Sequence, residues 1–173
     1  GYIHTRVTDL AEAKNHYANT LGLYETHAED GKVWYKGWDE WDHHSVVLEE
    51  GGLGVVKYGF KVQYLEDIDR IEKKAQDFGA KTERFSAGEV AEVGDGLRVY
   101  PPSGHVFEIY HEMTSWGLEV GTHNPEAFPR HLVGVGVPGL DHSLLTCEDV
   151  GLMEKFLAEV FDFYTAEKVM SSL

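Results

Sequence analysis

The residue with the clearest chemical potential is His142, which lies in a strand-like stretch at residues 139–146. A histidine on a strand can coordinate a metal ion, or it can be a packed, hydrogen-bonded residue. On residue type alone the packed role is favoured. His4 holds the same place at the start of an earlier copy of a repeated pattern, 138 positions before His142. The two histidines therefore have to be judged together.

The other candidate groups have weaker patterns. His43 and His44 are neighbours on or beside a strand, so we expect their side chains to point to opposite faces and to make a poor chelating pair. His111-Glu112 lacks the second histidine of a zinc-protease motif. Cys147 is interpreted as a small buried apolar residue. Core packing or a subunit interface is the expected use of three tryptophans, Trp34, Trp38 and Trp41.

Composition limits the classes of partner. Lys and Arg total 15 against 30 Asp and Glu, and a net charge of −15 argues against nucleic acid. No apolar run approaches the roughly 20 residues of a spanning helix, so we expect no membrane segment. A single cysteine excludes an intramolecular disulfide, and no signal-peptide pattern is visible, which favours the cytoplasm. The chain opens on Gly1 within a strand pattern, so we expect residues before it to be missing.

The elements that position these residues follow a repeated order. The first unit is a strand, a helix capped by Asp9 and stopped by Gly22, and further strands, at residues 1–8, 9–21, 32–36 and 45–49. The second unit repeats this order, with a Pro-to-Gly turn joining its last two strands, at residues 55–64, 66–78, 97–100 and 106–110. A third copy begins with a strand at residues 140–146, followed by a helix capped by Asp149.

This repetition predicts the architecture. One βαβββ copy cannot cover both sides of its own sheet, so two copies are expected to pair into a curved mixed sheet with helices outside and a cleft inside. The prediction is an α+β fold with modules at residues 1–50 and 55–112.

Several motifs then carry a family resemblance. They are residues 60–62 (Phe-Lys-Val), 102–108 (Pro-Ser-Gly-His-Val-Phe-Glu), 116–118 (Trp-Gly-Leu), 124–130 (Asn-Pro-Glu-Ala-Phe-Pro-Arg) and 140–144 (Leu-Asp-His-Ser-Leu). Together they closely resemble catechol 2,3-dioxygenases, the type I extradiol ring-cleavage enzymes of the vicinal oxygen chelate (glyoxalase/bleomycin resistance) superfamily. The linker segment makes the resemblance specific, because the glyoxalases and antibiotic-resistance proteins of this fold lack it.

The resemblance implies a domain plan and a chemistry. Residues 1–115 would be the N-terminal domain, 116–138 a linker, and 139–173 the first part of the catalytic domain. The reaction would be extradiol (meta) cleavage of a catechol by Fe(II) and dioxygen in aromatic-compound catabolism, in a cytoplasmic homotetramer. His142 would be the first iron ligand. The second histidine, the glutamate and the acid-base residues would lie beyond Leu173, so we expect no catalytic residue in this chain, no bound iron and no activity on its own.

The same resemblance explains the His4 set. Glu108 falls at the place of the carboxylate ligand, but the middle ligand position falls at about Lys57, and an ammonium group cannot bind iron. We interpret these residues as relics of a duplicated ancestor. Two alternatives remain open: a non-catalytic module in which residues 1–138 sequester a small molecule, and a metal-dependent isomerase resembling glyoxalase I.

Overall fold

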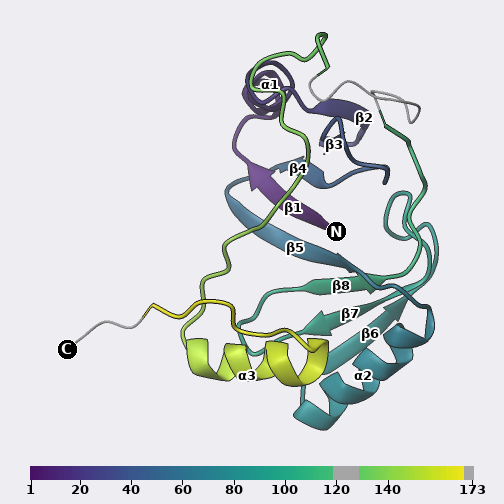
Figure 1. Ribbon diagram of the computed structural model, residues 1–173, viewed down its shortest axis with the longest axis vertical. Coiled ribbons are helices and arrows are strands. Elements are labelled where there is room, and N and C mark those ends of the chain that lie inside the picture. The colour runs from purple at the N-terminus through teal and green to yellow at the C-terminus, as the bar shows by residue number, and fades with distance from the viewer. Residues whose placement is uncertain (119–128, 170–173) are drawn as a thin grey trace.

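The computed structural model describes residues 1–118 and 129–169. Its centre is one eight-stranded mixed sheet with the order β2-β3-β4-β1-β5-β8-β7-β6 (Figure 1). The first module consists of β1 (Tyr2–Val7), α1 (Leu10–Asn15), the π-helical turn η1 (His16–Thr20), β2 (Tyr24–Glu29), β3 (Lys32–Lys36) and β4 (Val46–Glu50). The second consists of β5 (Gly54–Lys61), α2 (Glu66–Phe78), β6 (Lys81–Phe85), β7 (Gly96–Tyr100) and β8 (Phe107–Tyr110), and α3 (Val150–Phe161) follows.

The two modules join side by side through antiparallel pairing of β1 with β5. Within each module the first strand pairs in parallel with the last, β1 with β4 and β5 with β8. This is the predicted pair of βαβββ modules, and the expected fold is confirmed. The sequence pattern did not predict β2 and β6, which are the two edge strands of the sheet. Both are rich in charged and polar residues, as edge strands often are, and so lack a clear apolar alternation.

The helices begin where capping residues predict. The Asp9 side chain accepts a hydrogen bond from the amide of Glu12 at 2.9 Å, which fixes the start of α1. The α-helix ends at Asn15, and η1 continues the coil to Thr20, so the predicted helix of residues 9–21 has two parts. In the second module α2 has the predicted bounds. The residue after it, Gly79, has a left-handed φ of 95°, which residues with a side chain rarely adopt.

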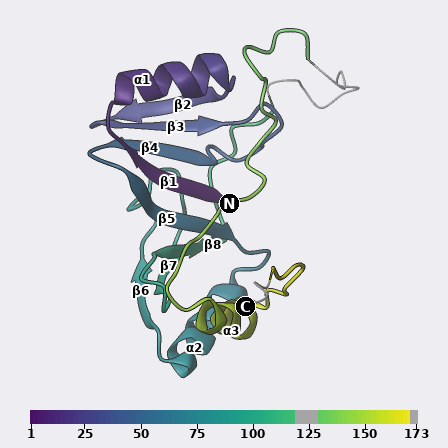
Figure 2. The same cartoon turned by 90° about the vertical axis from the view of Figure 1, so that its left-hand side faces the viewer.

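Strand alternation gives the sheet two chemically different faces. On the outer face, Tyr58 and Phe107 pack with α2 and α3 in one apolar cluster, while α1 covers a second cluster on the first module. The neighbouring residues Lys57 and Glu108 point to the opposite, inner face, because successive side chains on a strand alternate. Figure 2 shows α1 at one end of the sheet and α2 with α3 at the other.

The predicted strand at residues 140–146 is wrong: these residues have no regular secondary structure. A strand needs a partner, and this segment crosses the strands whose backbone groups are already paired within the sheet. Figure 1 shows it returning from the α1 end of the sheet toward α3. Its alternating pattern therefore reflects contacts such as that of Leu145 with the outer core, rather than sheet pairing.

The predicted helix after this segment is confirmed as α3. The Asp149 side chain accepts a hydrogen bond from the amide of Leu152 at 2.8 Å and caps it. Met153, Phe156 and Val160 are buried against the second module, so the apolar face of α3 is covered. No helix among the described residues is both long and apolar enough to cross a bilayer.

Candidate functional site

His142 lies at the surface, on the irregular segment that precedes α3. Its side chain is 87% exposed, and its Nδ1 is 2.7 Å from Oδ2 of Asp141. Beneath the segment is a cavity of about 420 Å³. Its lining includes the aromatic side chains of Phe60 on β5, Phe107 on β8 and Phe163 just after α3. The histidine is thus held next to an apolar hollow and is accessible to further protein groups or a ligand.

The geometry of His142 fits one position in a metal site. A metal-ligating histidine commonly donates a hydrogen bond from its second ring N–H to a carboxylate, and Asp141 is placed to accept such a bond from Nδ1–H, which leaves Nε2 for an ion. Residues 1–118 and 129–169 contain no group of three or more His, Cys, Asp or Glu side chains that could hold a metal. The described residues therefore supply one candidate ligand and not a complete site.

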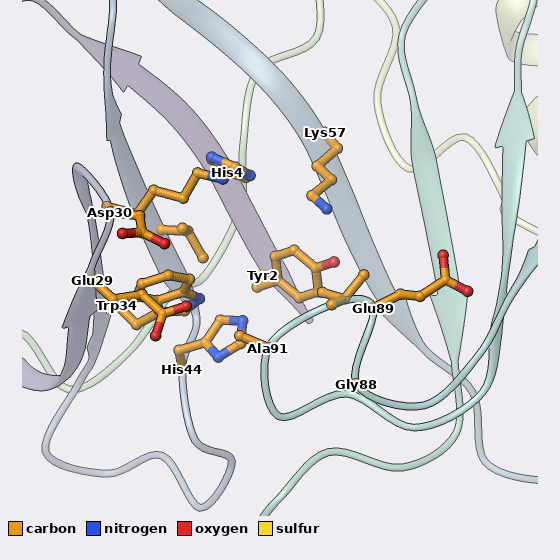
Figure 3. Close-up of a pocket in the computed structure, with 13 residues that line it drawn as sticks. Tyr2, His4, Glu29, Asp30, Trp34, His44, Lys57, Gly88, Glu89 and Ala91 are labelled. Carbon is orange, nitrogen blue, oxygen red and sulfur yellow. The ribbon is translucent and has the colours of Figure 1, made fainter.

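The residues interpreted as a duplicated site, His4, Lys57 and Glu108, come together on the inner face. His4 on β1 is the register partner of Lys57 on β5, and Glu108 lies on β8, the next strand. Figure 3 shows His4 and Lys57 on adjacent strands above Tyr2 and His44, lining one cavity of about 260 Å³. The sequence placed these three residues at corresponding positions of a duplicated site, and the structure does bring them close together.

Glu108 is fully buried and is neutralised by its neighbours. Lys57 Nζ lies 2.9 and 3.1 Å from its two oxygens, Arg98 Nε donates at 2.9 Å, and the hydroxyl of Tyr2 also donates to it. Burial alone would raise the pKa of Glu108, but the Lys57 charge and these hydrogen bonds outweigh burial and lower it. An ammonium group thus supplies the positive charge that a metal ion would otherwise bring to this carboxylate.

The histidines of the inner face are held neutral. Burial, with the nearby Lys57 charge, lowers the pKa of His4 to about 4, although Nε2 of His4 is 2.9 Å from the carboxylate of Glu49. Burial, followed by the effect of His43, lowers the pKa of His44 to about 3. At neutral pH both imidazoles can donate or accept a hydrogen bond without carrying charge.

The predicted divergence of His43 and His44 is wrong. Their Nδ1 atoms are 3.1 Å apart, because both residues precede β4 and lie outside any strand, so the alternation of a strand does not apply. Sequence reasoning also missed Arg98 and Tyr2 as partners of Glu108. Arg98 is opposite Glu108 in the β7–β8 hairpin, and Tyr2 is two residues before His4 on the same face. Hairpin register and strand alternation could have identified both.

Comparison with known proteins finds a matching family model and similar curated proteins. Residues 57–122 match the model of the catechol 2,3-dioxygenase-like N-terminal domain. The chain is 38% identical to a metapyrocatechase of Pseudomonas sp. (strain CF600) over 98% of its own length and 56% of the relative. A manganese-dependent 2,3-dihydroxybiphenyl 1,2-dioxygenase of Geobacillus genomosp. 3 is 23% identical over 65% of this chain and 36% of that relative.

Solved structures agree on the fold. The 2,3-dioxygenase LapB of Pseudomonas sp. KL28 superposes with a TM-score of 0.88 and 36% identity, covering 95% of this chain and 58% of that one. An extradiol ring-cleaving dioxygenase of B. fuscum gives 0.63 and 34% identity over 66% of this chain and 32% of its own. The arrangement is the vicinal oxygen chelate fold, and the chain spans a little more than half the length of the metapyrocatechase. Of the linker motif at residues 124–130, residues 124–128 lie outside the described part of the chain.

Proposed function

Because this chain is a catechol 2,3-dioxygenase-like sequence over almost its whole length, we propose that it is part of an extradiol dioxygenase that cleaves catechol-type aromatics with dioxygen. The observation that carries the proposal is the match to the metapyrocatechase and to LapB, which covers at least 95% of the chain and hence the His142 segment.

The proposal includes a division of labour along the chain. Residues 1–115 form the N-terminal domain, 116–138 link it to the next domain, and 139–173 begin the catalytic domain. His142 is the first metal ligand, with Asp141 holding its Nδ1 proton. A second histidine and a carboxylate, needed for a facial site, are supplied by residues outside this sequence. Fe(II) bound there would supply adjacent open positions for a catecholate and for dioxygen.

The N-terminal domain contributes binding surface rather than reacting groups. Its outer face supports the His142 segment, and the cavity of about 420 Å³ beneath that segment is lined in part by Tyr58 and Phe60. Its inner face holds the Lys57–Glu108 pair, so we do not assign a metal to it. A homotetramer and a cytoplasmic location complete the proposal on the strength of the family resemblance.

The test is an assay on a longer protein that contains this chain and the region that its relatives have beyond it. After anaerobic loading with Fe(II) or, separately, Mn(II), catechol and dioxygen should be consumed in equal amounts with formation of a yellow ring-cleaved aldehyde. The manganese arm is included because one relative is named as manganese-dependent. The chain of 173 residues, treated in the same way, should form no product. A longer protein that takes up metal but leaves catechol intact would refute the proposal.

A second candidate function has one observation in its favour. The inner cavity of about 260 Å³ is lined by Trp34, by Tyr2 and by the neutral imidazoles of His4 and His44, which is suitable for one small ring. A module that only sequesters a small molecule would bind catechol without metal and without consuming dioxygen. The same assay, with binding followed by calorimetry in the absence of metal, separates the two functions.

A further inference from the structure

The segment that carries His142 has no secondary structure of its own, so other contacts must fix its position. Two hydrogen bonds are placed symmetrically around the histidine. The amide of Leu140 donates to Oε1 of Glu40 at 3.0 Å, and the hydroxyl of Tyr58 donates to the carbonyl of Leu144 at 3.1 Å. Each bond is two residues from His142, and both partners belong to the first 115 residues.

The Glu40 anchor is itself rigidly held. Its Oε2 accepts hydrogen bonds from the amide of Gly37 at 2.5 Å and from the hydroxyl of Ser45 at 2.6 Å. The chain also passes very close to this carboxylate, because a Cβ atom at Gly139 would be only 2.9 Å from Cγ of Glu40. A carboxylate that accepts several N–H and O–H groups has few alternative positions. Glu40 therefore fixes the backbone on the N-terminal side of His142.

The Tyr58 anchor is fixed by packing. The ring is 4% exposed and makes edge contacts with Phe107 and His105, at centroid distances of 5.8 Å in both cases. Burial raises the pKa of its hydroxyl, so the group keeps its proton and acts as the donor to Leu144. The ring also lines the cavity of about 420 Å³ beneath the segment, and its hydroxyl contacts the backbone carbonyl of Leu144 beside that cavity.

We propose that Glu40 and Tyr58 are positioning residues for His142: they hold the backbone on both sides of it, so that the imidazole is presented to the metal in one orientation. The inference rests on the proposed role of His142 as a ligand. Four residues of extended chain span about 13 Å. With both ends fixed, the imidazole has a small range of positions. The loss of one anchor widens that range.

Tyr58→Phe in the longer, metal-loaded protein is the direct test, because it keeps the ring and removes only the hydroxyl. Tyr100→Phe is the matched control. The hydroxyl of Tyr100, on β7, also donates a hydrogen bond of 3.1 Å, to Glu83 on the neighbouring edge strand β6. We expect Tyr58→Phe to weaken Fe(II) affinity about tenfold, as loss of a group that orients a ligand typically does. The nitric oxide complex of the iron should give a broadened electron paramagnetic resonance signal. Tyr100→Phe should change neither quantity.

A second measurement needs no metal. Amide hydrogen exchange of residues 140–146 should be about tenfold faster in Tyr58→Phe and in Glu40→Gln than in Tyr100→Phe, while exchange in β5 and β8 stays the same. Equal exchange rates in all three variants would overturn the inference, whether or not the longer variants bind metal.

His142→Gln separates this inference from the proposed function. If His142→Gln loses the metal while Tyr58→Phe and Glu40→Gln retain it with unchanged affinity and spectrum, the positioning role is wrong and the ligand assignment stands. If His142→Gln keeps the metal with normal affinity, the ligand assignment fails and the positioning role fails with it.

Discussion

Replacing Lys57 with methionine should expose how much the inner face depends on an ammonium in place of a metal ion. The substitution leaves the fully buried Glu108 carboxylate without one of the two cations that lie 2.9 Å from it. Removing one partner of a buried ion pair costs about 3–5 kcal/mol. The Arg98 and Tyr2 hydrogen bonds remain and the Lys57 side chain is 19% exposed, so we expect a smaller loss, about 2 kcal/mol, in the free energy of unfolding.

Lys61→Met is the matched control, on the same strand and four residues further along. Lys61 pairs with Asp42 at 2.6 Å, but the two side chains are 37% and 28% exposed, so the loss should be about 0.5 kcal/mol or less. Urea unfolding of the 173-residue chain, extrapolated to zero denaturant, measures both variants. Lys57→Met with Glu108→Gln should cost less than Lys57→Met alone, because the double variant removes the fully buried carboxylate, while Arg98 still has Glu83 and Glu89 within 3.9 Å.

The pH dependence follows from the lowered pKa of Glu108 in the folded chain. A carboxylate of this kind contributes stability above its unfolded pKa of about 4.3, and this contribution is lost as the pH falls through the lower folded value. The difference in stability between the wild-type chain and Lys57→Met should therefore be largest at neutral pH and shrink below about pH 4. Equal losses for Lys57→Met and Lys61→Met at pH 7, or a difference that does not depend on pH, would refute this reasoning.

Three further perturbations test the packing and the buried histidines. Phe156→Ala removes a fully buried ring between α2 and α3 and should lower the free energy of unfolding by about 4 kcal/mol. Leu152, also on α3, is 41% exposed, so Leu152→Ala should lower it by about 1 kcal/mol or less. Urea unfolding measures both variants. Asp149→Ala removes the cap of α3 and should cost about 1 kcal/mol, with faster amide exchange in the first turn of that helix. His44 should remain neutral in an NMR titration until the pH falls to about 3. Because its pKa in the folded chain lies below the unfolded value, the chain should lose stability as the pH falls from about 6.5. His44→Gln should reduce that loss.

The paired modules could be predicted because local and global signals agree. The alternation around His4 indicates a strand, the cap at Asp9 and the stop at Gly22 mark the two ends of a helix, and the repeated order of elements then specifies how the modules pair. The edge strands β2 and β6 escaped prediction because an edge strand need not bury a regular apolar face. Residues 140–146 were misassigned since alternation alone cannot show whether a strand will find a partner.

The candidate site likewise has a part that the sequence predicts and a part that it does not. The family resemblance indicates His142 as a metal ligand, which stays a prediction, and the repeat related it to the set of His4, Lys57 and Glu108. Contacts between distant segments could not be predicted. Glu40 and Leu140 are 100 positions apart, and Tyr58 and Leu144 are 86 apart, so only the folded chain shows that residues of the first two modules contact the backbone on both sides of His142.

The ligand role of His142 can be tested by the iron content of two variants of the longer protein, His142→Gln and His4→Gln, which change corresponding positions of the sequence repeat. Both variants are reconstituted anaerobically with Fe(II) and separated from free metal. We expect His142→Gln to lose bound iron and His4→Gln to retain it, because Lys57, the neighbour of His4, already neutralises Glu108. Iron that is retained by His142→Gln and lost by His4→Gln would show that His142 is not a ligand.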